Sequence, residues 1–325
     1  MTGPGDAGGP PGPARGGLLV IGDVITDVVA RHTVPLAPAT DTTARVSTLP
    51  GGAGANAACW AARSGAPDVR LMGCVGADSA AWHEDALLRC GVRPALRVDP
   101  DAATGTVICL VDATAERTLV TDSGAALRLS AADWRDGLLD GVARLHLSGY
   151  LFFADGSRTL ASAAMAAARE RSVPVSVDPA SAGFIEQHGP AAFLTSVAAA
   201  DLLLPNSDEA TLLTGLADPA DAAAELSRDF SLVAVKRGAA GAVLAAGGDV
   251  LARVPAPVVA PVDTTGAGDA FTGAFLASLL TGGDPVAAAE AGCRAGAEAV
   301  TRAGGRPPER GVSAAAGALR SGAPT

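Results

Sequence analysis

A glycine-rich turn followed by an acidic residue carries the strongest chemical signal in this sequence of 325 residues. Gly266, Ala267 and Gly268 lack bulk and stand directly before a run with helical character. The first turn of a helix offers unpaired N–H groups and the positive end of the helix dipole, which suits a phosphoryl group. Asp269 falls inside this cluster of donors, where a carboxylate can accept a proton from a hydroxyl while the amides hold the phosphate. A helix cap preceded by a glycine turn is the alternative interpretation.

Three further polar clusters follow expected strands or begin expected helices. Asp27 lies just beyond the first apolar run, and carboxylates accept hydrogen bonds from vicinal hydroxyls strongly. Gly52 and Asn56 belong to a second glycine-rich segment, where a ligand can approach the backbone and an amide side chain both donates and accepts. Asn206 and Glu209 begin another expected helix, where a carboxylate can orient a hydrated Mg²⁺. A turn residue or a helix cap remains the alternative for each cluster taken alone.

The composition and charge exclude several classes of protein. With 24 Lys and Arg against 34 Asp and Glu, the formal charge is −10, so neither nucleic acid nor an anionic membrane is an expected partner. Lys236 is the single lysine and is followed by Arg237, so the Gly-Lys-Ser/Thr of a Walker A loop is absent. The five cysteines form no CxxC pair and the four histidines no HExxH pair, so we expect no disulfide framework, structural zinc or transition metal.

Targeting segments are also missing from the sequence. The N-terminal residues 1–17 are rich in Gly and Pro and lack the apolar core of a signal peptide. No stretch of eighteen apolar residues free of charge or Pro occurs. We therefore expect no membrane span and a cytoplasmic protein.

The clusters are positioned by short apolar runs that alternate with helical segments, which predicts right-handed βαβ crossovers and a mostly parallel sheet. Ligands bind beyond the carboxyl ends of the strands in such a sheet. Two β-rich segments, near residues 31–50 and 104–122, break the alternation, and we expect them to form one small sheet that stands off the main domain. The other expected strands are 18–22, 69–75, 145–148, 173–177, 202–204, 232–235 and 242–244, and the expected helices are 56–63, 79–90, 159–171, 207–214, 220–229, 269–280 and 285–303.

The combination of these motifs resembles the PfkB, or ribokinase-like, family of carbohydrate and nucleoside kinases. Asp263–Phe275 looks like the second signature of the family and Gly51–Ala58 like its first, in the correct order and about 210 residues apart. Asn206-x-x-Glu209 and residues 236–241 also match in order. The resemblance implies an α/β, ribokinase-like fold: a doubly wound, mostly parallel sheet flanked by helices, with a small β-sheet lid.

By this resemblance the chain divides into three parts. Residues 1–17 form a leader that we expect to be disordered, residues 18–312 the kinase domain, and residues 313–325 a C-terminal tail. The lid comes from about 31–50 and 104–122, and in such kinases it often makes a dimer contact, so we expect a homodimer through the lid.

The implied activity is the ATP-dependent phosphorylation of a primary hydroxyl on a sugar or a related polyhydroxy small molecule. ATP and Mg²⁺ are the implied cofactors. The resemblance also allows a K⁺ ion near the segment that begins at Asp263. A nucleoside kinase of the same family is one alternative, and a catalytically silent ligand-binding protein on this fold is another. A Rossmann oxidoreductase is a third, but the GxGxxG fingerprint is missing.

The resemblance also assigns roles to individual residues. Asp269 is the expected base, and Gly266, Ala267 and Gly268 form the expected anion hole. The expected substrate contacts are Asp27, Gly52 and Asn56. The residues expected to bind ATP are Asn206, Lys236, Gly238, Gly241, Gly268 and Cys293, the last of these at the adenine pocket. Glu209 is expected to bind Mg²⁺ through water, and K⁺ is expected at Asp263 with the carbonyl groups of Thr265, Ala299, Arg302 and Gly304.

The chain departs from ribokinase at three substrate positions. Ile25 stands where ribokinase has Asn, Ala53 where it has Lys, and Ser148 where it has Glu. Because fewer polar side chains remain to contact a sugar, we do not expect D-ribose to be the specific substrate. An apolar Ile25 suits a nucleoside base or a deoxy sugar. We expect the acceptor substrate to carry no phosphate group.

Overall fold

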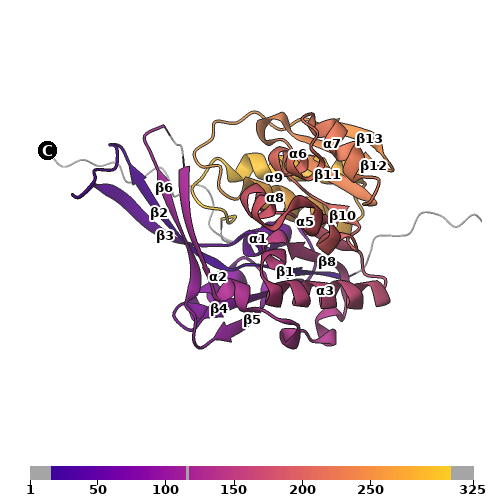
Figure 1. Cartoon of the computed structure of the whole chain (residues 1–325), viewed down its shortest axis with the longest axis horizontal. Coiled ribbons are helices and arrows are strands. Elements are labelled where there is room, and N and C mark those ends of the chain that lie inside the picture. The colour runs from indigo at the N-terminus through magenta and orange to yellow at the C-terminus, as the bar shows by residue number, and fades with distance from the viewer. Residues whose placement is uncertain (1–15, 115–116, 309–325) are drawn as a thin grey trace, which may run out of the picture.

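The computed structural model describes residues 16–114 and 117–308, and it has a large twisted sheet between two layers of helices with a smaller sheet at one side (Figure 1). The expected leader and the expected tail lie outside these residues, except for Gly16 and Gly17, and Gly17 begins the first strand. Within the described ranges, no helix combines the length and the apolar character that a membrane crossing requires.

In the described part of the chain, the main sheet has nine strands in the order β13-β12-β11-β10-β9-β8-β1-β4-β5. The strands from β11 to β5 in this order run parallel, and at the other edge β12 runs antiparallel to both of its neighbours, β11 and β13. Their bounds are β1 (Gly17–Ile21), β4 (Val69–Gly76), β5 (Arg93–Asp99), β8 (Val142–Ser148), β9 (Val175–Asp178), β10 (Leu202–Leu203), β11 (Leu232–Lys236), β12 (Ala242–Ala246) and β13 (Asp249–Val254).

Helices cover both faces of this sheet. The helices are α1 (Ala53–Arg63), α2 (Ala80–Arg89), α3 (Asp155–Glu170), α4 (Ala182–His188), α5 (Pro190–Val197), α6 (Ser207–Thr214), α7 (Pro219–Leu226), α8 (Ala267–Leu280) and α9 (Pro285–Ala299). Successive side chains of a strand point to opposite faces, so Leu19 and Ile21 of β1 pack in a core with α3 to α7, whereas Leu18 and Val20 pack with α1, α2, α8 and α9. Burial on both faces is the reason that β1 is apolar throughout.

The small sheet is the expected lid, and it stands off the main domain beside the carboxyl ends of the strands (Figure 1). Its strands are β2 (Ile25–His32), β3 (Ala44–Gly51), β6 (Thr104–Val111) and β7 (Arg117–Gly124), in the order β3-β2-β6-β7. The central pair β2 and β6 is parallel and the outer pairs are antiparallel. The first lid segment was expected to begin near residue 31, but β2 begins at Ile25, only four residues after β1.

Several elements differ from the sequence-based expectations. The chain contains β5 and β13, which were not expected because both are edge strands whose charged residues interrupt the apolar pattern. Helices α4 and α5 were also missed, since they are short, Gly189 separates them and Pro190 begins α5. Helix α3 begins at Asp155, four residues earlier than expected, and α9 ends at Ala299 rather than at 303. Short 3₁₀ turns complete the fold at 125–128, 131–133, 136–139, 149–153 and 238–240.

Candidate active site

Two cavities meet at Asp269, which lines both of them. The larger cavity, of about 570 Å³, lies between the carboxyl ends of β9 and β11 and the first turns of α6 and α8. The smaller cavity, of about 230 Å³, lies between the lid, the start of α1 and the segment around Tyr150. A carboxylate at the junction can therefore face ligands in both cavities at once.

Asp269 lies in the first turn of α8, directly after the glycine-rich turn. Gly266 precedes the helix with φ +73°, and a Cβ there would lie 2.4 Å from Cα of Gly305, so only glycine fits this position. Asn56 Nδ2 donates a hydrogen bond of 2.8 Å to Asp269 Oδ2. Burial raises the pKa of Asp269 to about 8, against the lowering effect of this hydrogen bond. A carboxyl with a pKa near neutrality has the basicity that a general base needs.

A buried ion pair joins the ends of two parallel strands beside the start of α8. Lys236 Nζ at the end of β11 lies 2.5 Å from Asp178 Oδ2 at the end of β9, and Thr272 Oγ1 donates a 2.7 Å hydrogen bond to the same oxygen. The paired side chains are only 11% and 12% exposed. Burial opposes the charge of Lys236, but Asp178 and Glu209 outweigh it and hold the pKa of Lys236 above its ordinary value. Lys236 is the one cationic side chain among the described residues that line the larger cavity.

Asn206 and Glu209 form a reciprocal cap at the start of α6. Asn206 donates to the Glu209 carboxylate through its backbone N–H and through Nδ2, each over 2.8 Å, and its Oδ1 accepts from the Glu209 N–H over 2.9 Å. Both residues line the larger cavity. Burial raises the pKa of Glu209 to about 7, while Lys236 lowers it. The cap interpretation of this motif is correct, and it leaves the two side chains at the wall of the cavity.

The oxygen donors of this end of the cavity suit a hydrated Mg²⁺. Asp178, Asn206 and Glu209 all line it, and Mg²⁺ prefers oxygen ligands while it keeps several of its waters. The described residues contain no cluster of three or more His, Cys, Asp or Glu side chains placed to hold a metal ion. The donor set fits an ion that is held mainly by water and phosphate oxygens.

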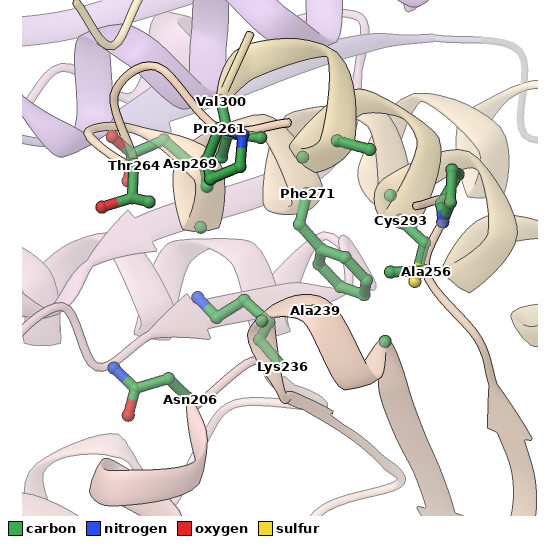
Figure 2. Close-up of a pocket in the computed structure, with 18 of the residues that line it drawn as sticks. Asn206, Lys236, Ala239, Ala256, Pro261, Thr264, Asp269, Phe271, Cys293 and Val300 are labelled. Carbon is green, nitrogen blue, oxygen red and sulfur yellow. The ribbon is translucent and has the colours of Figure 1, made fainter. Parts of the chain in front are cut away.

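The other end of the larger cavity is apolar. Figure 2 shows Asn206 and Lys236 at one end of this pocket and Ala256 and Cys293 at the other, with Phe271 between them. Gly238 and Gly241 also line the cavity. An elongated pocket with one polar and one apolar end suits a nucleotide, whose phosphates are charged and whose base has flat apolar faces.

Asp27, Gly52 and Asn56 line the smaller cavity, as does Asp23. Asp23 is already engaged, because its carboxylate accepts hydrogen bonds from the Ala53 and Gly54 N–H groups and from Ser148 Oγ. The Asp27 carboxylate accepts no hydrogen bond from the described residues, and burial raises its pKa to about 6. Asp27 is therefore the carboxylate that can accept a hydrogen bond from a ligand hydroxyl.

The remaining wall of the smaller cavity is mostly apolar. Ile25, one of the departures noted in the sequence, lines it next to Asp27. The lid adds Val29, Val107, Cys109 and Leu119, and the segment after β8 adds Tyr150. The alternation of β2 explains this wall, because Ile25, Asp27 and Val29 point to the same face of the lid.

The residues expected to hold K⁺ are only partly brought together. Asp263 Oδ1 accepts from the Thr265 N–H over 2.9 Å, and Oδ2 accepts from the Gly304 N–H over 3.2 Å. Arg31, from the end of β2, donates to the same Oδ2 over 3.2 Å. Ala299 and Arg302 bond to each other at the end of α9, where the Arg302 N–H donates to the Ala299 carbonyl.

Sequence reasoning missed Asp178 and Thr272, which contact each other beside Asp269. Asp178 was overlooked because the expected strand ended at 177, although an acidic residue at the carboxyl end of a buried parallel strand is the signal that could have found it. Thr272 lies one helical turn after Asp269, and nothing in the sequence distinguishes it from an ordinary helix residue.

Comparison with known proteins adds independent evidence. The sequence profile of the "pfkB family carbohydrate kinase" family matches residues 16–310. A fructokinase from Klebsiella pneumoniae is 31% identical over 289 residues, which are 83% of this chain and 87% of the relative. The resemblance that the two signatures predicted is confirmed.

Solved structures agree with the fold. A ribokinase from Thermotoga maritima superimposes with a TM-score of 0.77 at 25% identity, over 91% of this chain and 97% of that one. A candidate ribokinase II from E. coli, solved in complex with ATP and Mg²⁺, has a TM-score of 0.80 at 24% identity, over 89% of this chain and 94% of that one. The predicted doubly wound sheet with a small lid is confirmed.

Proposed function

Because this chain belongs to the pfkB family of carbohydrate kinases, which are phosphotransferases with an alcohol group as acceptor, we propose that it transfers the γ-phosphate of ATP to a primary hydroxyl of an uncharged sugar. The observation that carries the proposal is the position of Asp269 at the junction of the two cavities. ATP occupies the larger cavity and the acceptor the smaller one.

The proposed reaction is an in-line transfer. Asp269 accepts the proton of the acceptor hydroxyl, whose oxygen forms a bond to the γ-phosphorus. The bond from that phosphorus to the β–γ bridging oxygen breaks, and ADP leaves with both electrons of this bond. Mg²⁺, when bound to the phosphates, neutralises part of their charge. The N–H groups at the start of α8 and the ammonium of Lys236 stabilise the charge on the transferred group.

Each residue has a separate part in binding. Asn206, Gly238, Gly241 and Cys293 contact ATP, and Glu209 orients Mg²⁺ through water. Their positions along the larger cavity support this assignment. In the smaller cavity, Asp27 accepts hydrogen bonds from acceptor hydroxyls, while Asn56 orients Asp269 through their 2.8 Å hydrogen bond.

The charge of the smaller cavity supports an acceptor without phosphate or carboxylate groups. Asp23, Asp27 and Asp269 line it, and its other lining residues in the described ranges carry no positive charge. An anionic acceptor would meet like charges at short distance, which costs several kcal/mol in a partly buried site. A neutral polyol avoids this repulsion and donates hydrogen bonds to the Asp27 carboxylate.

A panel of acceptors tests the proposal. ADP release would be measured with fructose, ribose, deoxyribose and other neutral sugars, and in parallel with their phosphate esters and sugar acids. We expect kcat/KM for the best neutral sugar to exceed that of its phosphate ester by at least about 100-fold. Preference for a phosphorylated acceptor would contradict the substrate class, and an absence of ADP release with every acceptor would contradict the kinase activity.

A nucleoside is a second candidate acceptor. The observation that favours it is the apolar wall formed by Ile25, Val29, Val107 and Leu119, against which a base can pack. Adenosine and other nucleosides belong in the same panel. A higher kcat/KM for a nucleoside than for every free sugar would establish this alternative.

The outer face of the lid supports the homodimer that the family resemblance predicts. Val46, Ile108 and Val120 are 59%, 41% and 54% exposed on strands whose opposite face lines the cavity. We propose that a second copy of the chain covers this face.

A further inference from the structure

Arg31 occupies the place at Asp263 where the family resemblance implies a monovalent cation. Asp263 stands at the start of the loop that leads through Gly266 to Asp269, and only 7% of its surface is exposed. A buried carboxylate needs a positive partner or several hydrogen bonds. Arg31 supplies the positive charge, since its Nη2 donates a 3.2 Å hydrogen bond to Asp263 Oδ2, and the Thr265 and Gly304 N–H groups supply further hydrogen bonds.

While the Arg31 guanidinium stays at Asp263, a cation does not fit beside this pair. Thr265 and Gly304 each donate a backbone N–H to the Asp263 carboxylate, so both carboxylate oxygens already accept hydrogen bonds. The carbonyl of Ala299 accepts the N–H of Arg302 and keeps a second lone pair, so it stays open to a cation when the Arg31 charge is removed. An added K⁺ at the carboxylate would also have to approach the guanidinium charge of Arg31, and two cations at such distances repel each other.

We propose that Arg31 is a built-in replacement for the monovalent cation, so that this kinase works without K⁺ and braces its anion-hole loop from the lid. The inference rests on the proposed kinase function, in which that loop holds the transferred phosphoryl group. Arg31 is 232 residues away from Asp263 in the sequence and belongs to the strand that carries Asp27 and Ile25. The ion pair therefore connects the acceptor side of the site with the phosphate side.

The test compares three proteins in KCl and in tetramethylammonium chloride at equal ionic strength. They are the wild type, Arg31→Met and, as a matched control, Arg45→Met. Arg45 lies directly across from Arg31 in the lid ladder and is exposed. Methionine keeps an unbranched apolar chain at each position, so the loss of charge is the main change.

We expect the wild type and Arg45→Met to have the same kcat in both salts. Arg31→Met should lose about tenfold in kcat in tetramethylammonium chloride and recover most of it in KCl, because K⁺ can then bind at Asp263. A second readout does not depend on activity: K⁺ should raise the Tm of Arg31→Met and leave the Tm of the other two proteins unchanged.

Two results would overturn the inference. One is a wild type whose kcat or Tm depends on K⁺, and the other is an Arg31→Met variant that responds to K⁺ no more than the wild type does. If no acceptor gives turnover with any of the three proteins, the proposed function fails, and the Tm comparison still decides the role of Arg31.

Discussion

At the scale of single residues, the surroundings of Asp269 decide its basicity. Burial raises its pKa, and the charges of Asp178 and Asp23 raise it further, whereas the Asn56 hydrogen bond lowers it. The result, a pKa of about 8, makes the carboxylate a far stronger base than an exposed aspartate. The raised pKa also means that folding favours the protonated form of this group.

The activity should therefore follow the ionisation of Asp269. In the free enzyme kcat/KM should rise with pH and level off above about pH 8, because only the ionised carboxylate accepts the proton. Asp269→Asn should lower kcat by roughly 10²–10⁴-fold and lose this pH dependence, while its Kd for ATP changes little. Initial rates across pH and titration calorimetry with ATP would measure these effects.

The stability of the same variant provides a control. The stabilising contribution of a group with a raised pKa is complete below its unfolded value of about 4 and is lost as the pH rises through about 8. Asp269→Asn should consequently be at least as stable as the wild type at pH 9 in urea unfolding. A variant that retains a near-wild-type kcat would remove Asp269 from the mechanism.

At the scale of elements, the parallel strands explain how the phosphate end of the site is assembled. Strands β9 and β11 end at the same edge of the sheet with β10 between them, so Asp178 and Lys236 come together although 58 residues separate them. Helix α8 adds Asp269 and, one turn later, Thr272, which donates to Asp178. The ammonium of Lys236 lies beside Gly268, 3.6 Å from where a Cβ would stand.

This arrangement makes Asp178 a positioning residue for Lys236. Lys236→Met should lower kcat by about 10²–10³-fold, the cost of removing one group that stabilises the developing charge. Asp178→Asn should lower kcat less and keep the KM of the acceptor, because Lys236 stays charged but loses its fixed position. Steady-state kinetics of the two variants and of the double variant would measure the coupling.

The double variant distinguishes positioning from a general structural effect. If Asp178 acts through Lys236, the double variant should have about the kcat of Lys236→Met alone. Strictly multiplicative losses in kcat would show that the two residues act independently. Thr272→Val, which removes only a hydrogen bond to Asp178, serves as the mild control.

At the scale of the whole molecule, the two faces of the lid differ in what they contact. Its inner face lines the smaller cavity, and its outer face presents Val46, Ile108 and Val120 to solvent. Adjacent strands place Ile108 directly opposite Val120. A second copy that covered this face would also keep the lid in place over the acceptor.

A charge on the outer face should therefore prevent dimer formation. We expect the wild type to be a dimer and Ile108→Glu to be a monomer in size-exclusion chromatography with light scattering. Val250→Glu is the matched control, because Val250 is 39% exposed on β13, at the edge of the main sheet remote from the lid (Figure 1). A monomeric wild type, or a dimer that survives Ile108→Glu, would contradict the proposed interface.

The sequence by itself determined the class of fold and the family, and it predicted some of the residues that line the two cavities. Buried parallel strands such as β1 are continuous apolar runs, and the start of α8 is marked by small residues before a helix, so both features are local and readable. Edge strands such as β5 were not predicted, because their charged residues interrupt the apolar pattern that marks a strand.

Only the tertiary structure decided which residues meet. Asn56 bonds to Asp269 across 213 residues of sequence, Lys236 to Asp178 across 58 and Arg31 to Asp263 across 232. Each pair depends on strand order and on where the lid folds back, and local spacing carries neither. The K⁺ expectation illustrates the difference, because the motif around Asp263 is local, whereas the arginine that pairs with it comes from the opposite end of the chain.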